Sequence, residues 1–277
     1  MGLLPLSPAT AQVVDFRSTV VVGPSGVPAD DGAALIEALA GITASAEAPV
    51  LLKIEPGRYD LGGVSLVMKP FVDVEGSGPA VTLLTGEVAG AFGTQQGVVT
   101  VARNSELREL TVENRFDQTI TSDSAAIVVR AGGRMRDVNA VATGSGVLAR
   151  AILTTFFDSE EPAELSNVTA RAQTRAVQVV FPGLEADGLT AKGAEGLFVS
   201  SGAVTLRNAI VEGTNFAALV ANLSPEVNFV ATQLVGELAC GNSQCRCVNA
   251  YNGAFEPLAN DCGSFLPTPT PAPPRDR

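Results

Sequence analysis

The sequence predicts an all-β protein, a right-handed parallel β-helix solenoid with a short N-terminal capping helix. Three observations support this fold class. Strand-turn-strand segments fill the chain from Val50 onward, and a six-residue pattern recurs through its middle. One amphipathic helix lies ahead of these segments, where it can cover the core of the first coil.

The N-terminal cap is expected to consist of a strand at residues 17–22, a turn at 23–26 and the helix. Asp30 and Asp31 are suitable N-caps, and Gly41 is a suitable C′ residue just after the helix. The apolar positions of the helix are Ala34, Leu35, Ala38 and Leu39. This spacing predicts that one side of the helix packs on the coils.

The repeat appears five times, beginning at residues 107, 135, 165, 186 and 206, as LRELTV, MRDVNA, LSNVTA, ADGLTA and LRNAIV. A second apolar strand follows each repeat. Alternation places the first, fourth and sixth positions inside. The fourth positions, expected to form one inward column, are Leu110, Val138, Val168, Leu189 and Ala209. The third positions, expected to turn the chain in the left-handed region, are Glu109, Asp137, Asn167, Gly188 and Asn208.

Composition excludes several kinds of site. The chain has 18 basic and 29 acidic residues, a net charge of −11, so a nucleic-acid partner is not expected. No apolar run is long enough to span a membrane. Histidine and tryptophan are absent, which removes the usual general base near neutral pH and the best sugar-stacking side chain.

The ends of the chain predict export. Ala9-Thr10-Ala11 has the small-x-small form of a signal-peptidase site, so residues 1–11 are interpreted as the remnant of a secretory signal, with a disordered N-terminus as the alternative. A single domain is expected over residues 12–265, comprising a cap at 12–49, coils at 50–239 and a disulfide-bearing cap at 240–265. The proline-rich residues 266–277 predict a disordered tail or a spacer.

The four cysteines lie close together, at positions 240, 245, 247 and 262, and allow three pairings. Cys245 and Cys247 are too close in an extended chain to pair comfortably. The favoured pairs are Cys240–Cys245 and Cys247–Cys262, and the alternative is a metal cluster, for which the spacing is poor. Disulfides in turn predict an oxidising compartment, extracellular or periplasmic.

Three segments resemble the opening of pectin-lyase-like parallel β-helix proteins. They are residues 26–39 (GVPADDGAALIEAL), 54–62 (IEPGRYDLG) and 72–78 (VDVEGSG). The end, from Cys247 to Cys262, is similar to the C-terminal cap of secreted bacterial members. These motifs identify the scaffold rather than a reaction, because one fold can host many functions.

The catalytic motifs that the resemblance implies are not matched. Glycosidases of this fold carry three aspartates and Gly-His-Gly, and the chain has no histidine. The Arg-x-Pro-x-x-Arg element of pectate lyases does not occur, and pectin methylesterases pair two aspartates with an arginine and a tryptophan. The sequence therefore favours a role without catalysis.

Two insertions, at residues 114–124 and 155–164, carry the candidate site residues. Arg115, Asp117, Asp123 and Arg150 are the candidate catalytic residues. Asp117, Asp123 and Asp158 are candidate calcium ligands, since calcium binds hard oxygen atoms. The alternative is that these side chains are solvated loop charges with no role in a site. The same alternative applies to Arg171, Arg175, Glu195 and Glu212.

We therefore expect a secreted β-helix scaffold with a binding or structural role, and a polysaccharide as the first-choice partner. A calcium-dependent polysaccharide lyase, or a related carbohydrate-active enzyme, is one alternative. A surface adhesin module displayed on the proline-rich segment is another. The sequence leaves the ligand and the oligomeric state open.

Overall fold

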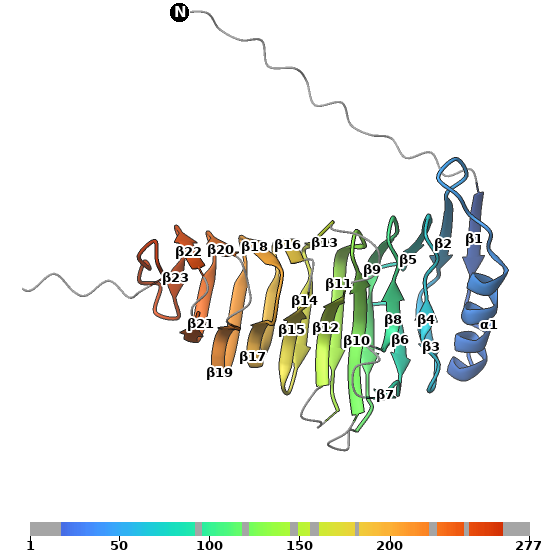
Figure 1. Ribbon diagram of the computed structural model, residues 1–277. Coiled ribbons are helices and arrows are strands. Elements are labelled where there is room, and N and C mark those ends of the chain that lie inside the picture. Colours follow the sequence, from blue (N-terminus) through green and yellow to red (C-terminus); the bar gives the residue numbers. More distant parts are fainter. Residues whose placement is uncertain are drawn as a thin grey trace, which may run out of the picture.

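The computed structural model describes residues 18–91, 96–117, 122–144, 149–155, 161–180, 183–221, 226–240 and 244–262. These residues form a parallel β-helix whose coils follow one another along a single axis, with one helix at the N-terminal end (Figure 1). The predicted signal remnant and the proline-rich tail lie outside the described residues. Among the described residues, no helix has both the length and the apolarity needed to cross a membrane.

The strands form three parallel ladders, which we call faces 1, 2 and 3. Face 1 contains β1 (Ser18–Val22), β2 (Val50–Ile54), β5 (Val72–Glu75), the first parts of β9 (Glu106–Asn114) and β11 (Arg134–Ala142), β13 (Ala163–Ser166), β16 (Gly183–Asp187), β18 (Ala203–Arg207), β20 (Glu226–Val230) and β22 (Gln244–Val248). Face 2 contains β3 (Gly57–Asp60), β6 (Thr82–Gly86), the ends of β9 and β11, β14 (Thr169–Ala172), the first parts of β17 (Thr190–Val199), β19 (Ile210–Val220) and β21 (Gln233–Ala239), and β23 (Tyr251–Asn252). Face 3 contains β4 (Leu66–Val67), β8 (Gly97–Val101), β10 (Ser122–Arg130), β12 (Ala149–Thr155), β15 (Arg175–Val179) and the ends of β17, β19 and β21. The short β7 (Gly90–Ala91) pairs antiparallel with the start of β10.

The third position of the repeat is the corner between faces 1 and 2. All five predicted turn residues have positive φ, from 50° at Asn208 to 72° at Gly188. The alternation predicts one strand for each repeat. In the structure the first two residues of the repeat lie on face 1 and the last three lie on face 2. Ala231 (φ 48°) and Asn249 (φ 51°) continue the corner into two later coils.

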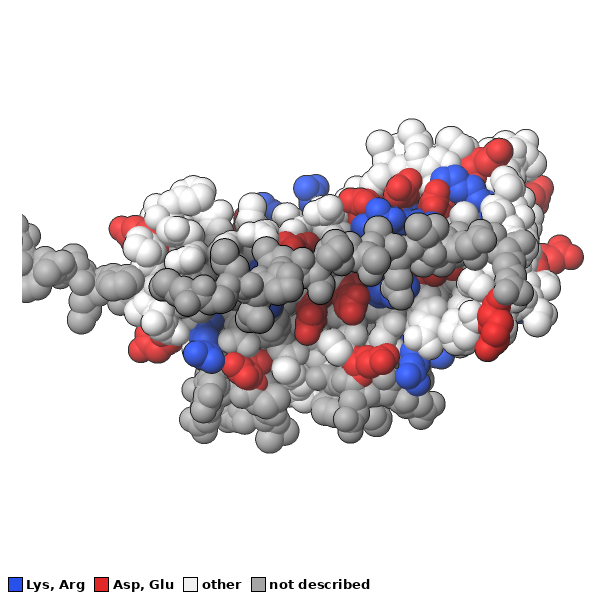
Figure 2. All heavy atoms as spheres, turned by 90° about the horizontal axis from the view of Figure 1, so that it is seen from above, with Lys and Arg blue, Asp and Glu red and all other residues white. Residues whose placement is uncertain are grey.

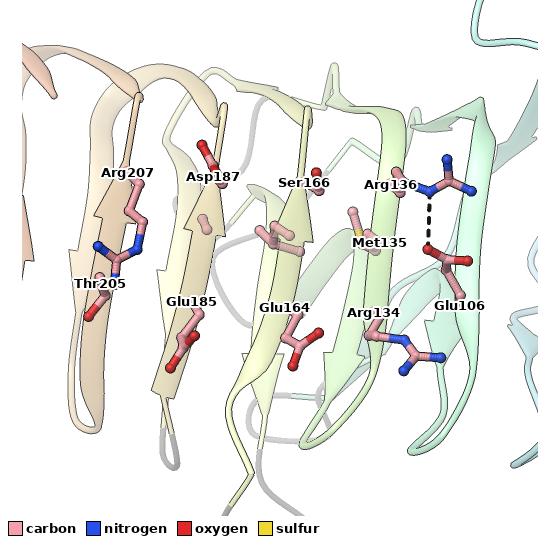
Figure 3. A pocket seen from close by; sticks show the side chains of 12 residues that line it. Glu106, Arg134, Met135, Arg136, Glu164, Ser166, Glu185, Asp187, Thr205 and Arg207 are labelled. Atoms are coloured by element: carbon pink, nitrogen blue, oxygen red, sulfur yellow. Dashed lines mark hydrogen bonds and ion pairs between the residues drawn. The ribbon is translucent and has the colours of Figure 1, made fainter. Parts of the chain in front are cut away.

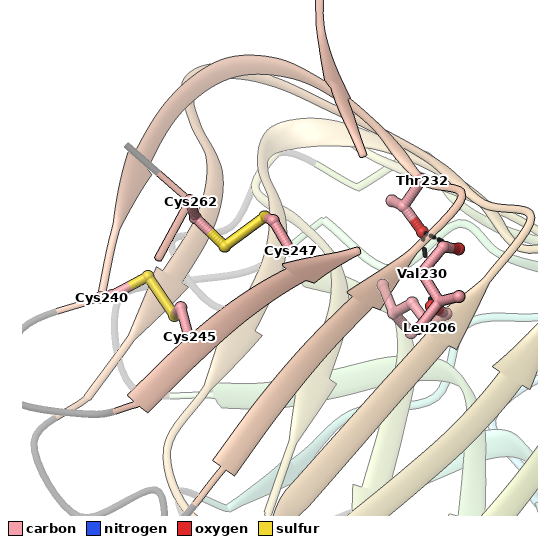
Figure 4. Close-up of a disulfide and its surroundings, with 7 residues drawn as sticks. All are labelled: Leu206, Val230, Thr232, Cys240, Cys245, Cys247 and Cys262. Carbon is pink, nitrogen blue, oxygen red and sulfur yellow. Dashed lines mark hydrogen bonds between the residues drawn. A yellow bond between two sulfur atoms is a disulfide. The ribbon is translucent and has the colours of Figure 1, made fainter. Parts of the chain in front are cut away.

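The predicted inward column is confirmed. Leu110, Val138, Val168, Leu189 and Ala209 are each at most 2% exposed and belong to one core cluster. In the next coil Thr232 takes the same place, fully buried, and its hydroxyl lies 3.0 Å from the Val230 carbonyl oxygen (Figure 4). A polar side chain fits this column because it donates its proton to the backbone.

The helix α1 (Pro28–Gly41) covers the N-terminal end of the core, as predicted, but its cap differs from the prediction. Val27 is the N-cap and Ile42 the C-cap, so Asp30 and Asp31 lie in the first turn and Gly41 is the last helical residue. The Ser25 hydroxyl and amide both donate to Asp31, at 2.6 Å, and these bonds lower the pKa of its carboxyl.

The buried side of α1 is also rotated relative to the prediction. Gly32, Leu35 and Leu39 are buried, whereas Ala34 is exposed. The reason lies in the packing partner, because Gly32 sits directly on the backbone of β3. At the other end of the helix, Lys69 Nζ donates to the carbonyl oxygens of Ala40 and Ile42, at 2.7 and 2.6 Å, which satisfies groups that a helix end leaves open.

The C-terminal cap contains both favoured disulfides, Cys240–Cys245 and Cys247–Cys262 (Figure 4). The segment before Cys262 folds back over the last coil. The Cys247 amide donates to the Asn260 carbonyl at 2.9 Å, and the Leu258 amide donates to Ala250 at the same distance. The chain thus covers the edge of its final strands, which would otherwise present unpaired backbone groups.

We expect the second disulfide to contribute more stability than the first, because it closes a longer loop. Cys247 and Cys262 are 15 residues apart, while Cys240 and Cys245 are 5 apart. Loss of the 15-residue link in Cys262→Ser should lower the free energy of unfolding by about 2–4 kcal/mol, as measured by urea denaturation. Cys240→Ser is the matched control, with a smaller expected loss. Four alkylatable thiols in protein purified without reductant would contradict both pairings.

Candidate functional site

The outer surface of face 3 carries a connected group of polar and aromatic side chains. Arg150 of β12, Arg175 of β15 and Glu195 of β17 lie in register on consecutive strands. Gln178 and Phe198 form a second outward row beside them. We call these five residues the arginine cluster.

The contacts within the cluster hold Arg175 in one orientation. Its Nε donates to Glu195 Oε2 at 2.6 Å, and its Nη1 donates to Gln178 Oε1 at 3.1 Å. Its Cζ lies 3.9 Å from the centre of the Phe198 ring, a cation–π contact. The Nη2 group of Arg175 has no partner among the described residues, so a positioned guanidinium presents open donors at the surface.

Gln178 also joins the two arginines. Its Oε1 accepts a hydrogen bond from Arg150 Nε as well as from Arg175, so a neutral oxygen lies between two positive charges. Arg150 is only 4% exposed. Like charges directly opposite each other in a sheet are destabilising. Arg150 has a further interaction besides the one with Gln178, so the open donors of Arg175 are the feature of the cluster that favours an anionic ligand.

Of the predicted catalytic residues, Arg150 belongs to this cluster and Arg115 does not. Arg115 follows the face 2 part of β9, and its Nη2 lies 3.1 Å from Asp60 Oδ2 and 3.9 Å from Glu87 Oε1. Burial acts in the opposite direction, but the Gly62 amide and the Arg115 guanidinium hold the pKa of Asp60 below its usual value. The two arginines are thus placed on different faces.

The predicted calcium ligands are not brought together within the described part of the chain. Asp117 is exposed. The backbone of Asp123 pairs with Gly90, and its side chain lies outside the described residues, as does the whole of Asp158. No group of three cysteine, aspartate or glutamate side chains suited to a metal ion occurs in the ranges that the structure describes. The calcium site stays a prediction.

The interpretation of Arg175 and Glu195 as solvated charge is wrong. Both lie on strands, and their side chains are 19% and 18% exposed. The signal that could have found them is the spacing of three four-residue segments: Arg150 begins RAIL, Arg175 begins RAVQ and Glu195 begins EGLF. These segments recur at the coil period, so their first and fourth positions had to share the outer surface of one face.

Face 1 is also strongly charged, but at its N-terminal half the charges neutralise one another. Lys53 lies 2.5 Å from Glu75, and Arg108 lies 2.6 Å from both Glu75 and Glu106. Arg136 reaches Glu106 at 3.3 Å. Seen from above, acidic and basic side chains are intermingled rather than separated (Figure 2). This ladder of ion pairs is a structural feature of stacked strands.

Further along face 1 a shallow hollow of about 270 Å³ lies over β11, β13, β16 and β18. Glu164 and Glu185 lie in register at its centre, with Arg134 toward one end and Arg207 toward the other (Figure 3). Charges of both signs surround it, and they favour no single class of ligand. The arginine cluster is therefore the better candidate site.

Neither a protein-family model nor a curated protein matches the chain. Similar solved structures include YbhC of Escherichia coli, with a TM-score of 0.54 and 13% identity over 94% of this chain and 81% of that one. The pectin methylesterase PemA of Erwinia chrysanthemi has a TM-score of 0.50 and 13% identity over 91% and 93%. The pectin methyl esterase of the rice weevil has a TM-score of 0.51 and 11% identity over 93% and 86%.

These likenesses define the class of protein. The chain shares the right-handed parallel β-helix fold of YbhC and of the pectin methylesterases, in agreement with the resemblance noted in residues 26–78. At such low identity the likeness shows the fold alone. Function has to be argued from the arginine cluster.

Proposed function

We propose that this chain is an exported carbohydrate-binding β-helix that holds an acidic glycan on face 3. The observation that carries the proposal is the guanidinium of Arg175, which Glu195, Gln178 and Phe198 hold in one orientation while its Nη2 has no partner among the described residues. A carboxylate of the glycan would accept hydrogen bonds from the open Nη2 of Arg175. Export is supported by the two disulfides and by the small-x-small motif near the N-terminus.

The organisation of face 3 suits a polymer. Successive strands stack about 4.8 Å apart, so outward side chains recur along the axis of the helix. The pectin methylesterases with this fold act, by their name, on a polysaccharide. The fold thus offers a long surface, and the cluster supplies the specific contacts on it.

The sharpest test is Gln178→Glu. A carboxylate at this position would form ion pairs with both arginines, so the melting temperature should stay the same or rise. The same change places a negative charge beside the open Nη2 of Arg175, which repels a carboxylate ligand, and the affinity for trigalacturonate should fall at least tenfold, by about the 1.5–3 kcal/mol of a hydrogen bond to a charged group. Isothermal titration calorimetry measures this loss.

Gln173→Glu is the matched control, because Gln173 is exposed and its amide bonds only to the Thr143 carbonyl among the described residues. It should bind as the parent does. Equal affinity in Gln178→Glu and the parent would refute the proposed site. Unsaturated products from polygalacturonate or alginate, formed only with calcium, would instead show the lyase that was the alternative.

A further inference from the structure

The outer surface of face 3 is covered on one side of Arg175 and accessible on the other. Toward the N-terminal end, β12 places Arg150 and Leu153 next to the cluster, and these outward side chains are only 4% and 2% exposed. Toward the C-terminal end, β17 and β19 present outward side chains that are partly exposed. Along the axis of the helix, an elongated ligand that meets the open donors of Arg175 can therefore continue only toward the C-terminal cap.

The accessible side is apolar. It consists of Phe198 of β17 and of Phe216 and Leu219 of β19, which we call the apolar strip. Phe216 is in register with Glu195, and Leu219 is in register with Phe198, so the strip continues both outward rows of the arginine cluster. The Phe198 ring also contacts the Arg175 guanidinium. The cluster and the strip thus form one continuous surface, charged at one end and apolar at the other.

The charges that border the strip are acidic. Phe216 lies in one in-register row between Glu195 of β17 and Glu237 of β21. Glu195 is paired with Arg175, whereas Glu237 is exposed and has no ion pair among the described residues. Adjacent strands are about 4.8 Å apart, so a carboxylate placed over Phe216 would lie close to Glu237 and be repelled. The strip therefore favours a part of the ligand that carries no charge.

We infer that the ligand is a glycan in which an acidic unit neighbours an uncharged one, with the acidic unit on Arg175 and the uncharged unit on the apolar strip. The C–H groups of a pyranose ring form an apolar surface that matches the strip. The inference rests on the proposed function, since both need the carboxylate contact with Arg175. A uniform polyuronate fits less well, because its next carboxylate would meet Glu237. Phe216 and Glu237 are thus the residues that determine specificity.

Glu237→Gln tests the role of charge, by isothermal titration calorimetry with trigalacturonate and with its analogues that keep one terminal carboxylate and have galactose as the other units. The parent should bind the better analogue more tightly than trigalacturonate, by about twofold or more. Glu237→Gln should raise the affinity for trigalacturonate about two- to fivefold, the value of one exposed charge pair, and leave the affinity for the analogues unchanged. Glu185→Gln, which removes an exposed charge from face 1, is the matched control and should change neither affinity.

Phe216→Gln tests the apolar contact. It should lower the affinity for trigalacturonate and for the analogues about three- to tenfold, because apolar surface under the ligand is lost. Ile210→Gln is the matched control, since Ile210 lies on the same strand but on face 2, where it is 43% exposed. It should bind as the parent does. The melting temperature of each variant shows whether the fold is intact, and Glu237→Gln decides the matter if Phe216→Gln does not fold.

The outcomes separate this inference from the proposed function. Unchanged affinities in a folded Phe216→Gln would overturn the inference, and so would a Glu237→Gln that binds trigalacturonate no better than the parent. The arginine cluster would still stand in either case if Gln178→Glu loses trigalacturonate. Equal affinity in Gln178→Glu and the parent, or a parent that binds none of these saccharides, would overturn both proposals.

Discussion

Val168→Asp should lower the free energy of unfolding by about 3–5 kcal/mol, because it places a charge without a partner in the core. Val168 is 1% exposed and stacks in the column that runs through every coil of the repeat. For a chain of this size the melting temperature should fall by on the order of 10 °C. Thermal denaturation followed by circular dichroism measures the change.

Thr169→Asp is the control, one residue further along the same coil. Its side chain lies on the outer surface of face 2, in register with Asn139 and Thr190, where water can solvate a carboxylate. We expect the free energy of unfolding to change by less than about 1 kcal/mol at this partly exposed position. If Val168→Asp melts like Thr169→Asp, the assignment of the inward column is wrong.

Gly32→Ala should displace the capping helix. A Cβ at this position would lie 2.1 Å from the Asp60 carbonyl oxygen and 2.5 Å from its carbonyl carbon, both backbone atoms that cannot rotate away. The helix has to move off β3, which exposes Leu35 and Leu39. We expect the free energy of unfolding to fall by about 3 kcal/mol, a value comparable with other overpacked cores. Urea denaturation measures this change.

The same helix contains its own control. No heavy atom lies within 4 Å of a Cβ added at Gly41, and the φ of this residue is not in the left-handed region. Gly41→Ala should therefore raise stability by about 0.5 kcal/mol, since alanine loses less backbone entropy in a helix. Equal losses of stability in both variants would mean that contact with β3 does not explain the effect at Gly32.

The corner between faces 1 and 2 shows how far sequence periodicity reaches. Asp137, Asn167, Gly188 and Asn208 are residues that tolerate the left-handed region, and their recurrence at the third position predicted the turn. Glu109 has no such preference, yet its φ is 57°. It takes this conformation because its neighbours in the repeat, Leu107 and Leu110, both have to point inward.

The N-terminal cap shows where local rules fail. Asp30 and Asp31 have the propensity of N-caps, but the helix begins at Pro28 because the Ser25 hydroxyl and amide bind the Asp31 carboxylate. The buried side of the helix likewise depends on β3, a strand that begins 16 residues after the helix ends. Spacing within the helix could not show that Gly32, rather than Ala34, faces this strand.

The sequence by itself determined the β-helix, its inward column, its disulfide-bearing end and one member of the candidate site, Arg150. These features could be predicted because the core and corner positions recur along the chain once in each coil. Each such position can be recognised from the alternation of apolar and polar residues next to it. The tertiary structure decided which charges meet. Arg150, Arg175 and Glu195 are separated by 20 residues or more, and the exact register of adjacent coils brings them together on face 3 while it pairs Arg115 with Asp60 on face 2.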